Sequence, residues 1–365
     1  MTHPAARQAA TDEDYRRLGI RRGAVSPRED AAHTDDSPGT YEWWYFDAHL
    51  SNGATLVVIF MNKPLAQPEL PLTPLLRVSL ELPDGRVYNS MDVHPAETWS
   101  ASRTELDVRI GANRFSGDLD EIRIQAASDD IVVDVTMTPQ VHAWRPETGH
   151  MYFGEGTDQL FGWLPAIPQG AVQGSYTIDG ETHEVSGIGY HDHNWGDASL
   201  PEIVHDWYWA RGQAGPFSTI TSFITAAEDY GYGTIPIFLL ARDGVPVADD
   251  AEKVVFDVEG VYTDEETGKP VATTTRYRYT DGEDEYTVEF VRDRDLVRRR
   301  MGDDRMGDAQ DGADKEDQGG AYLRFAGTLE ITHRRGGELV ETHREESAVW
   351  ELMYFGPARE PEITR

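Results

Sequence analysis

A histidine- and aspartate-rich segment, residues 189–196 (Gly-Tyr-His-Asp-His-Asn-Trp-Gly), carries the groups best suited to acid–base chemistry. In an extended strand, alternation places both imidazoles and Trp195 on one face, and Asp192 with Asn194 on the other. A carboxyl or imidazole group buried beside aromatic rings can exchange protons with an apolar substrate. We therefore predict that Asp192 and His193 are catalytic. We also predict that His191 and Trp195 contact the substrate.

The His-x-His pattern of this segment can also bind a metal ion. Such sites usually have a third protein ligand, but Asp197, Glu202 and His205 follow no spacing typical of a known ligand set. We therefore predict no metal site. A structural hydrogen-bonded network, in which Asp192 or Asn194 fixes the tautomer of a histidine, stays open as an alternative.

An aromatic segment, residues 41–50 (Tyr-Glu-Trp-Trp-Tyr-Phe-Asp-Ala-His-Leu), is a second candidate. Alternation assigns its apolar even-numbered residues, from Trp44 to Leu50, to a protein core. The opposite face combines aromatic rings with a carboxylate and an imidazole, which suits a cavity for an apolar ligand. Its members are Tyr41, Trp43, Tyr45, Asp47 and His49. We predict a catalytic role for Asp47 and substrate contacts for Trp43, Tyr45 and His49; the alternative is a half-exposed sheet surface.

A third segment, residues 205–212 (His-Asp-Trp-Tyr-Trp-Ala-Arg-Gly), places Trp207 and Trp209 on the same face of a strand. Two neighbouring indole faces can stabilise a developing cation, at about 0.5–2 kcal/mol for each cation–π contact. We predict that both tryptophans contact the substrate, although core packing would explain them equally. Arg211 is expected to have a structural role, stacked on an indole or paired with Asp206.

The elements that must position these residues are strands. From residue 40 onward, short runs of β-type residues alternate with turn signals such as Ser51-Asn52-Gly53 and Asp179-Gly180. Many short strands at close spacing predict an all-β protein of sandwiches or barrels, with a few short helices. The remaining segments are predicted to be irregular. They are a polar N-terminal tail, or a loose helix that docks late, over residues 1–38, an internal loop over residues 161–173 and an acidic, mobile loop over residues 302–320.

Composition limits the partners. The chain of 365 residues has 33 basic and 65 acidic residues, and its net charge of −32 argues against nucleic acid. It contains no cysteine, which excludes disulfides and thiolate chemistry. No apolar run approaches the roughly 20 residues of a membrane-spanning helix, and residues 1–38 lack the apolar core of a secretory signal, so we expect a cytoplasmic protein. A salt-rich host and a high-GC genome both stay open as reasons for the acidic composition.

Three motifs together resemble the lipocalin-like family that includes carotenoid 1,2-hydratase (hydroxyneurosporene synthase). They are Tyr-Glu-Trp-Trp-Tyr-Phe-Asp at 41–47, Gly-Tyr-His-Asp-His-Asn-Trp-Gly at 189–196 and Trp-Tyr-Trp-Ala-Arg at 207–211. Their order and spacing match as well, and the resemblance extends over residues 40–356. It implies two consecutive lipocalin-like β-barrel domains, which we place at residues 39–200 and 201–365. It also implies an apolar pocket and no cofactor.

The resemblance implies chemistry too. The family includes hydratases that add water to an alkene of a carotenoid or prenyl group, and fungal relatives that cyclise polyenes as Diels–Alderases. The His-x-Trp pair thought to matter in the hydratases falls on His193 and Trp195. Those enzymes also carry a Tyr-x-Asp motif further along, where this chain has Thr-Ile-Thr-Ser-Phe-Ile at 219–224 and no carboxylate. This departure puts carotenoid hydration itself in doubt.

We therefore predict a cofactor-independent enzyme that hydrates, isomerises or cyclises an apolar polyene or terpenoid. Protonation of an alkene requires a buried carboxylic acid and gives a carbocation. Aromatic rings around the cation stabilise it, and a water or base in a fixed position completes the reaction. Asp47 or Asp192 would supply the proton, and His193 would act as the base or orient the water. A pericyclic reaction would need only shape and one or two hydrogen-bond donors. The alternative from another class is a non-catalytic, lipocalin-like carrier of a hydrophobic lipid or terpenoid.

Other enzyme classes lack support in the sequence. It has no Gly-x-Ser-x-Gly elbow, no P-loop and no Gly-x-Gly-x-x-Gly after a strand, as serine hydrolases, NTPases and dinucleotide enzymes would require. The expected partner is a hydrophobic small molecule, without nucleic acid or a membrane span. Transient contact with a membrane surface to collect the substrate stays open, as does the oligomeric state.

Overall fold

The computed structural model describes residues 5–128, 130–300 and 319–364. The segment predicted as an acidic, mobile loop, residues 302–320, lies outside the described residues except for Gly319 and Gly320. Within the described ranges, no helix is long and apolar enough to cross a membrane.

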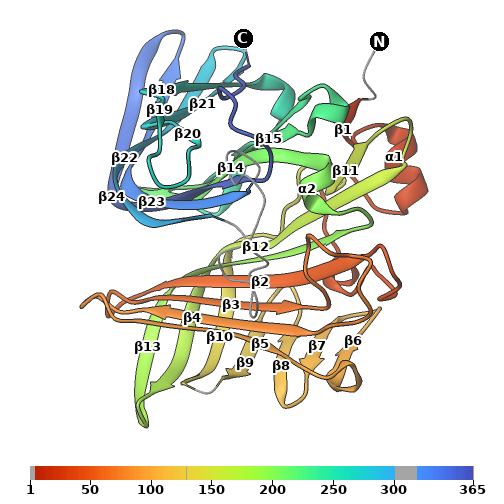
Figure 1. Cartoon of the computed structure of the whole chain (residues 1–365). Helices are drawn as coiled ribbons and strands as arrows, with labels where there is room; N and C mark the ends of the chain where they lie inside the picture. Colours follow the sequence, from red (N-terminus) through yellow and green to blue (C-terminus); the bar gives the residue numbers. More distant parts are fainter. Residues whose placement is uncertain (1–4, 129, 301–318, 365) are drawn as a thin grey trace. The chain divides into compact units, whose positions relative to one another are not determined.

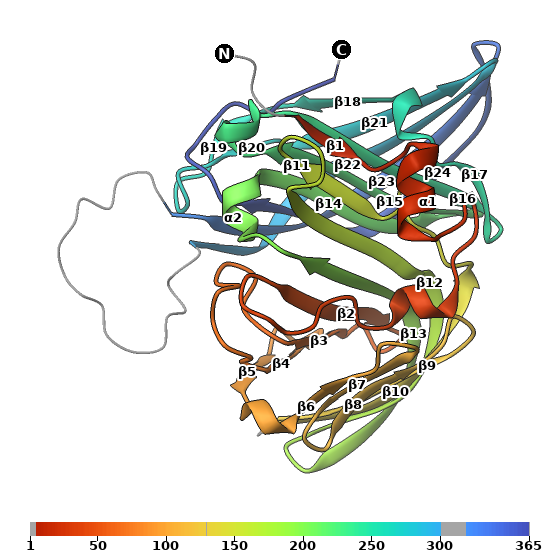
Figure 2. The same ribbon diagram turned by 90° about the vertical axis from the view of Figure 1, so that its right-hand side faces the viewer.

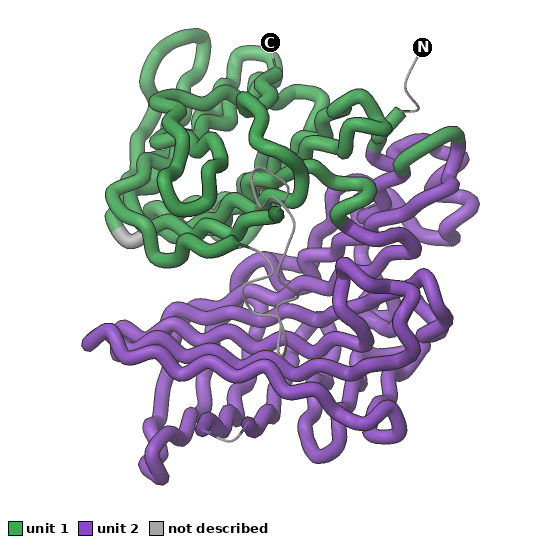
Figure 3. The backbone as a smooth tube through the Cα atoms, viewed as in Figure 1, with its two compact units in different colours: residues 1–7, 153–155, 201–365 green, residues 8–152, 156–200 purple. Residues whose placement is uncertain are grey.

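The chain forms two compact units (Figure 3). Unit 1 comprises residues 1–7, 153–155 and 201–365, and unit 2 comprises residues 8–152 and 156–200. Three short elements contain residues of both units. They are strand β1 (Ala6–Gln8), strand β11 (His150–Phe153) and helix α2 (Leu200–Ile203).

Unit 2 is built almost entirely from strands. Its helical elements are α1 (Asp12–Leu18) and the 3-10 helices η1 (Pro27–Asp30) and η2 (Ala96–Thr98). Its strands are β2 (Tyr41–Leu50), β3 (Thr55–Met61), β4 (Leu75–Glu81), β5 (Val87–Val93), β6 (Trp99–Ala101), β7 (Leu106–Ile110), β8 (Asn113–Gly117), β9 (Ile122–Ala127), β10 (Ile131–Val141), β12 (Gln159–Ile178) and β13 (Glu181–Gly196).

These strands form one antiparallel sheet in the order β5-β4-β3-β2-β13-β12-β10-β9-β8-β7-β6. The sheet curls, so that β2–β5 and β6–β10 form opposed walls (Figure 2). The core between the walls comes from alternate positions of the strands, among them Trp44, Val58, Val78, Phe115 and Val135. Alternation of this kind is typical of strands with one buried face. The structure thus confirms the alternation predicted for residues 41–50.

Unit 1 repeats this architecture on a smaller scale. Its strands are β14 (Val204–Ala214), β15 (Phe217–Ala226), β16 (Thr234–Arg242), β17 (Val245–Ala248), β18 (Val254–Glu259), β19 (Tyr262–Thr263), β20 (Pro270–Val271), β21 (Thr274–Asp281), β22 (Asp284–Arg300), β23 (Ala321–Arg335) and β24 (Glu338–Tyr354), with the 3-10 helices η3 (Glu228–Tyr230) and η4 (Ala251–Lys253). Nine of the strands form an antiparallel sheet in the order β17-β16-β15-β14-β24-β23-β22-β21-β18 (Figure 1). The all-β prediction is therefore confirmed.

Two segments differ from the sequence-based expectation. Residues 161–173 are predicted as an internal loop, but they belong to strand β12, whose register shifts between Leu164 and Ile167 and between Ile167 and Gly170. The bulges allow a strand with proline and glycine to remain paired on both sides. Residues 1–38 are predicted as a polar tail, whereas residues 8–38 are part of unit 2 and bury Asp30. Polar side chains hold this segment to the rest of unit 2 by hydrogen bonds, and the segment has no apolar stripe.

Candidate functional site

The candidate site of unit 2 is built on the central strand pair β2 and β13. The two strands are antiparallel, with Trp44 opposite His193 and Tyr45 opposite Asp192. Asp179 and Gly180, both with positive φ, form the tight turn that joins β12 to β13 and sets the register between these two strands. Side chains therefore divide between two faces. We call them the Glu42 face (Glu42, Trp44, Phe46, His191, His193 and Trp195) and the Asp192 face (Trp43, Tyr45, Asp47, Trp163, Tyr190, Asp192 and Asn194).

Asp192 is the centre of the Asp192 face. Its side chain is buried and accepts three hydrogen bonds. Tyr190 Oη donates at 2.7 Å and Trp163 Nε1 at 2.8 Å to one carboxyl oxygen, and Asn194 Nδ2 donates at 2.7 Å to the other. Burial raises the pKa of Asp192 to about 7, although these donors oppose the shift. A carboxyl group with this pKa is suited to exchange a proton near neutral pH.

Aromatic rings surround this carboxyl group. Trp43 stacks with Phe161 at 6.0 Å between ring centroids, and Tyr45 meets Tyr190 edge-on at 6.1 Å. Tyr45 Oη also donates to the carboxylate of Asp47 at 3.0 Å. The Asp192 face thus combines two acidic groups with a set of indole and phenol rings, a surface suited to apolar, π-rich molecules.

The Glu42 face holds a different arrangement, in which imidazoles meet carboxylates directly. His191 Nε2 lies 3.0 Å from Asp30 Oδ2, and its Nδ1 lies 2.8 Å from the backbone carbonyl of Tyr45. His193 Nε2 lies 2.8 Å from Glu42 Oε1. All four of these side chains are at most 1% exposed. Asp30 comes from η1 in the N-terminal segment, so this segment supplies part of the buried network.

Stacked rings fix the imidazoles and Trp195. His193 stacks on Trp44 at 4.2 Å, and His33 stacks on Trp195 at 3.8 Å with an interplanar angle of 2°. On β12, Gly162 gives Trp195 its space, because a Cβ atom at that glycine would lie 2.1 Å from the indole ring. Trp195 is therefore held in one orientation on the Glu42 face.

Three buried histidines of unit 2 are held neutral. Burial lowers the pKa of His33 and of His150 to about 4, and the pKa of His193 to about 3. His191 differs: burial lowers its pKa, but the Asp30 carboxylate, the backbone of Tyr45 and the charge of Asp192 together outweigh burial and raise its pKa above the usual value. The Glu42 face therefore contains a charged His191–Asp30 pair beside a neutral His193.

The structure divides the ten predicted site residues into three groups, on the Asp192 face, on the Glu42 face and in unit 1. Asp192, Asp47, Trp43 and Tyr45 come together on the Asp192 face, and His49 follows on the same face further along β2, where it is half-buried. His191, His193 and Trp195 lie on the Glu42 face.

Trp207 and Trp209 are half-buried on β14 in unit 1. There Trp207 donates to Glu351 at 3.3 Å. The structure therefore does not place all of these residues on one surface of unit 2.

Sequence reasoning missed the carboxylates that face the histidines. It considers Asp192 or Asn194 as the residue that fixes a histidine tautomer, but Asp192 contacts Tyr190, Trp163 and Asn194 instead. Asp30 and Glu42 take that role. The signal for Glu42 was present, because alternation places it on the core face beside Trp44, where a carboxylate must have a partner. No comparable signal exists for Asp30 or Trp163.

In the part of the chain that the structure describes, no group of three or more histidine, aspartate or glutamate side chains is arranged to hold a metal ion. The nitrogens of His191 face an aspartate and a backbone carbonyl, and Nε2 of His193 faces a glutamate. These contacts explain why the His-x-His pattern does not present converging ligands.

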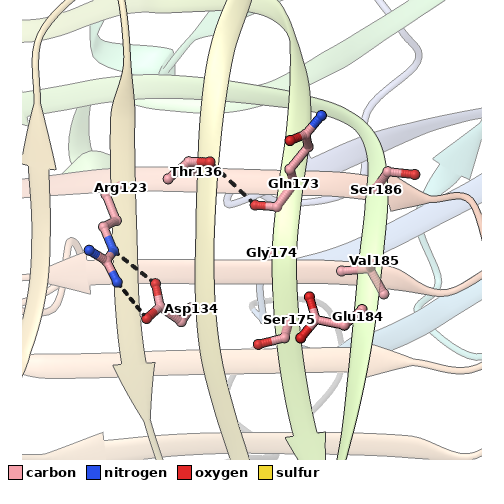
Figure 4. A pocket seen from close by; sticks show the side chains of 9 residues that line it. All are labelled: Arg123, Asp134, Thr136, Gln173, Gly174, Ser175, Glu184, Val185 and Ser186. Atoms are coloured by element: carbon pink, nitrogen blue, oxygen red, sulfur yellow. Dashed lines mark hydrogen bonds and ion pairs between the residues drawn. The ribbon is translucent and has the colours of Figure 1, made fainter.

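An open groove lies elsewhere on the sheet, over β9, β10, β12 and β13 (Figure 4). Its one basic side chain, Arg123, forms a two-point ion pair with Asp134 at 2.7–2.9 Å. None of the predicted site residues lines this groove. Its polar and internally paired lining does not suit an apolar ligand.

Comparisons with known proteins relate this chain to several enzymes. A family model described as Diels-Alderase-like matches residues 36–301. The quinolone epoxide rearrangement protein asqO of Emericella nidulans is 29% identical over 197 residues, which cover 50% of this chain and 53% of that protein. The hydroxyneurosporene dehydrogenase of Chlorobaculum tepidum is 28% identical over 216 residues, with 50% and 56% covered. The chain thus matches about half the length of these curated relatives.

Solved structures match over a greater length. The crystal structure of CghA has a TM-score of 0.64 and 15% sequence identity, and the match covers 98% of this chain and 99% of that one. At this identity the likeness concerns the fold, which is the lipocalin-like arrangement expected from the sequence.

Proposed function

The chain belongs to the Diels-Alderase-like family, and from this premise we propose that it is an enzyme that isomerises, cyclises or hydrates an apolar polyene or terpenoid. Membership confirms the resemblance drawn from the three aromatic motifs. Matched relatives are named for epoxide rearrangement and for Diels–Alder chemistry, which supports the reaction class. The substrate and the reacting residues are our own assignment.

One observation carries the proposal: a buried carboxyl group with a pKa of about 7 whose three hydrogen-bond partners all donate. When Asp192 is protonated, Trp163 Nε1 and Asn194 Nδ2 cannot accept its proton, and Tyr190 Oη already accepts from Trp163 Nε1 at 3.2 Å. The proton is therefore available to a substrate laid against the Asp192 face. An acid is most effective when its pKa lies near the working pH, and Asp192 meets this condition.

The surrounding residues support the same reaction. Protonation of an alkene or an ether oxygen develops positive charge on the substrate, and the rings of Trp43 and Trp163 can stabilise a cation by about 0.5–2 kcal/mol each. Tyr190 and Asn194 hold the carboxyl group and stabilise the carboxylate left after transfer. Asp47, buried on the same strand face, is the candidate acceptor for a proton lost from the cation.

The remaining predicted residues receive supporting roles in the proposal. His193 and Trp195 lie on the opposite face of β13, so we assign them to positioning the strand that carries Asp192. The second predicted role of His193, orientation of a water, would require a nitrogen on the Asp192 face. Trp207 and Trp209 remain proposed substrate contacts of unit 1.

The test uses the full chain and a panel of linear polyenes and terpenoid alcohols in water enriched in oxygen-18. Products are identified by mass spectrometry, and binding is followed by tryptophan fluorescence. We expect product from the native protein and a loss of about 10²–10⁴-fold in Asp192→Asn, with binding retained. Asp179→Asn, in the turn of the same hairpin, is the matched control and should react normally. Binding without product in the native protein would instead support a lipid or terpenoid carrier.

A further inference from the structure

The Glu42 face contains two buried polar atoms that have no hydrogen-bond partner, His193 Nδ1 and Asp30 Oδ1. They lie 3.5 Å apart, and both side chains are at most 1% exposed. Leaving such buried atoms unpaired destabilises the folded state. Their proximity indicates that the protons of this cluster are arranged so that one atom donates to the other.

Asp30 cannot supply the missing proton. Nδ1 of His191 faces the backbone carbonyl of Tyr45 and carries a proton. Nε2 faces Asp30 Oδ2, and because the charge of Asp30 raises the pKa of this ring, we assign the second proton to Nε2, which makes His191 a cation. Its partner Asp30 is then an ionised carboxylate with one oxygen, Oδ1, still unpaired. Oδ1 can only accept. The donor at this contact must therefore be His193 Nδ1.

The surroundings of His193 agree with a proton on Nδ1. The backbone of Glu29 also favours a proton on this ring. Burial keeps the ring neutral, with a pKa of about 3. A neutral imidazole with a proton on Nδ1 has a lone pair on Nε2. That lone pair points at Glu42 Oε1, 2.8 Å away.

We propose that Glu42 is held as a neutral carboxylic acid, which donates its proton to His193 Nε2 and thereby fixes His193 in the Nδ1–H tautomer. In this arrangement His193 Nδ1 donates to Asp30 Oδ1, and both unpaired atoms become satisfied. The pairs His191–Asp30 and Glu42–His193 are then each neutral overall. The alternative, an ionised Glu42 with the proton on Nε2, leaves both atoms unpaired and one net negative charge in the core, which is costly.

The other contacts of Glu42 are compatible with the acid form. Its Oε1 accepts from the backbone of His33 at 2.6 Å, and its Oε2 accepts from the backbone and hydroxyl of Thr34 at 3.0 and 2.8 Å. A carboxylic acid keeps acceptor capacity for such donors while donating one proton. Burial also raises the pKa of Glu42. Glu42 therefore connects two parts of unit 2: it accepts hydrogen bonds from the N-terminal segment and, in this proposal, donates one to His193 of strand β13.

The titratable groups that face this cluster come from three parts of unit 2. The N-terminal segment contributes Glu29, Asp30 and His33, strand β2 contributes Glu42, and strand β13 contributes His191 and His193. Glu29 is an ionised partner of Arg145 at 3.2 Å. Glu29 therefore provides a matched carboxylate in the same segment.

The experiment is nitrogen-15 NMR of the histidine side chains in the full-length protein at neutral pH, with His193 assigned by comparison with His193→Gln. We expect a protonated Nδ1 and an unprotonated, hydrogen-bonded Nε2. A protonated Nε2 with a bare Nδ1 would overturn the proposal. Because the reading uses the native protein, it does not depend on the folding of a variant or on any assignment of activity.

Infrared spectroscopy gives an independent reading. One carbonyl stretch of a protonated carboxylic acid should be lost in Glu42→Gln and kept in Glu29→Gln, while the corresponding band of Asp192, whose pKa is about 7, stays in both variants. A difference spectrum between native protein and Glu42→Gln that shows only the bands of an ionised carboxylate would also overturn the proposal.

Discussion

The two faces of the β2–β13 pair carry the same kinds of groups but pair them differently. On the Glu42 face each carboxyl group meets an imidazole, at 2.8–3.0 Å. On the Asp192 face the central carboxyl group meets only a phenol, an indole and an amide. The cationic His191 stabilises the Asp30 carboxylate strongly, whereas the neutral donors around Asp192 stabilise its carboxylate less.

The comparison shows that one strand pair can hold residues that stabilise the fold on one face and a residue suited to acid–base chemistry on the other. Adjacent residues of β13 point to opposite faces, so the chain can place a structural histidine and a reactive aspartate side by side in sequence. The Glu42 face anchors the N-terminal segment through Asp30 and Glu42. The Asp192 face keeps a proton exchangeable near neutral pH, which we propose is used on a substrate.

The largest effect on stability is expected from Asp30→Ala. The change leaves the buried His191 cation without its carboxylate, and breaking such a pair costs about 3–5 kcal/mol. Chemical denaturation should show this loss in the free energy of unfolding. Asp35→Ala, an exposed position of the same segment, is the control. A loss below about 1 kcal/mol for Asp30→Ala would mean that the Glu42 face does not anchor the segment.

Acid should destabilise the protein through its neutral buried histidines, of which His150 is a clear case. Its pKa is about 4 in the folded protein, against about 6.5 in an unfolded chain. Between these values only the unfolded chain binds the proton. The free energy of unfolding is therefore highest above pH 6.5 with respect to this group, and it decreases as the pH drops towards 4. This contribution is about 3 kcal/mol at most.

His150→Gln should remove that part of the pH dependence, as measured by urea denaturation at a series of pH values. An unchanged slope between pH 6.5 and 4 in the variant would show that His150 is already protonated in the folded protein.

Activity should depend on pH through the Asp192 face. If the acid form of Asp192 reacts, kcat/KM falls about tenfold for each pH unit above its pKa of about 7. A pH–rate profile should thus lose about 50-fold between pH 7, where half of Asp192 is protonated, and pH 9. Residual activity of Asp192→Asn should lack this dependence. A flat profile in the native enzyme would assign the chemistry to another group or to shape alone.

The smallest effect on stability is expected from a change at Gly162, which affects the packing of Trp195 on the Glu42 face. A Cβ atom at this position would overlap the Trp195 indole, and overpacking of this kind costs about 1–3 kcal/mol. Gly162→Ala should therefore lower the midpoint of denaturation. Gly233→Ala, where the nearest atom would be 3.5 Å from the new Cβ, should be tolerated. Equal stability of the two variants would indicate that the indole moves freely.

Local patterns were sufficient to predict the strands and the division of side chains between faces. Alternation alone separates Asp192 from His193 and Trp43 from Trp44, and the structure confirms both separations. The Asp179-Gly180 turn was equally readable, since its residue types accept positive φ. These features depend on neighbours in sequence.

Features that depend on distant partners could not be predicted. The contact of Asp30 with His191 joins residues 161 positions apart, and nothing in the polar N-terminal segment indicates a buried carboxylate. Trp163 was hidden in a stretch whose proline and glycine favour a loop, whereas two register shifts keep it in β12. The pKa of each buried group depends on the side chains that contact it from distant parts of the chain, and these contacts are known only from the structure.

Titration of the Asp192 carboxyl carbon by carbon-13 NMR directly tests whether this group has a pKa near neutral pH. Aspartate is labelled in the full-length protein, and the resonance is assigned by its loss in Asp192→Asn. The account predicts a titration midpoint at about pH 7. A resonance that stays ionised down to about pH 4, the range of an ordinary aspartate, would contradict it.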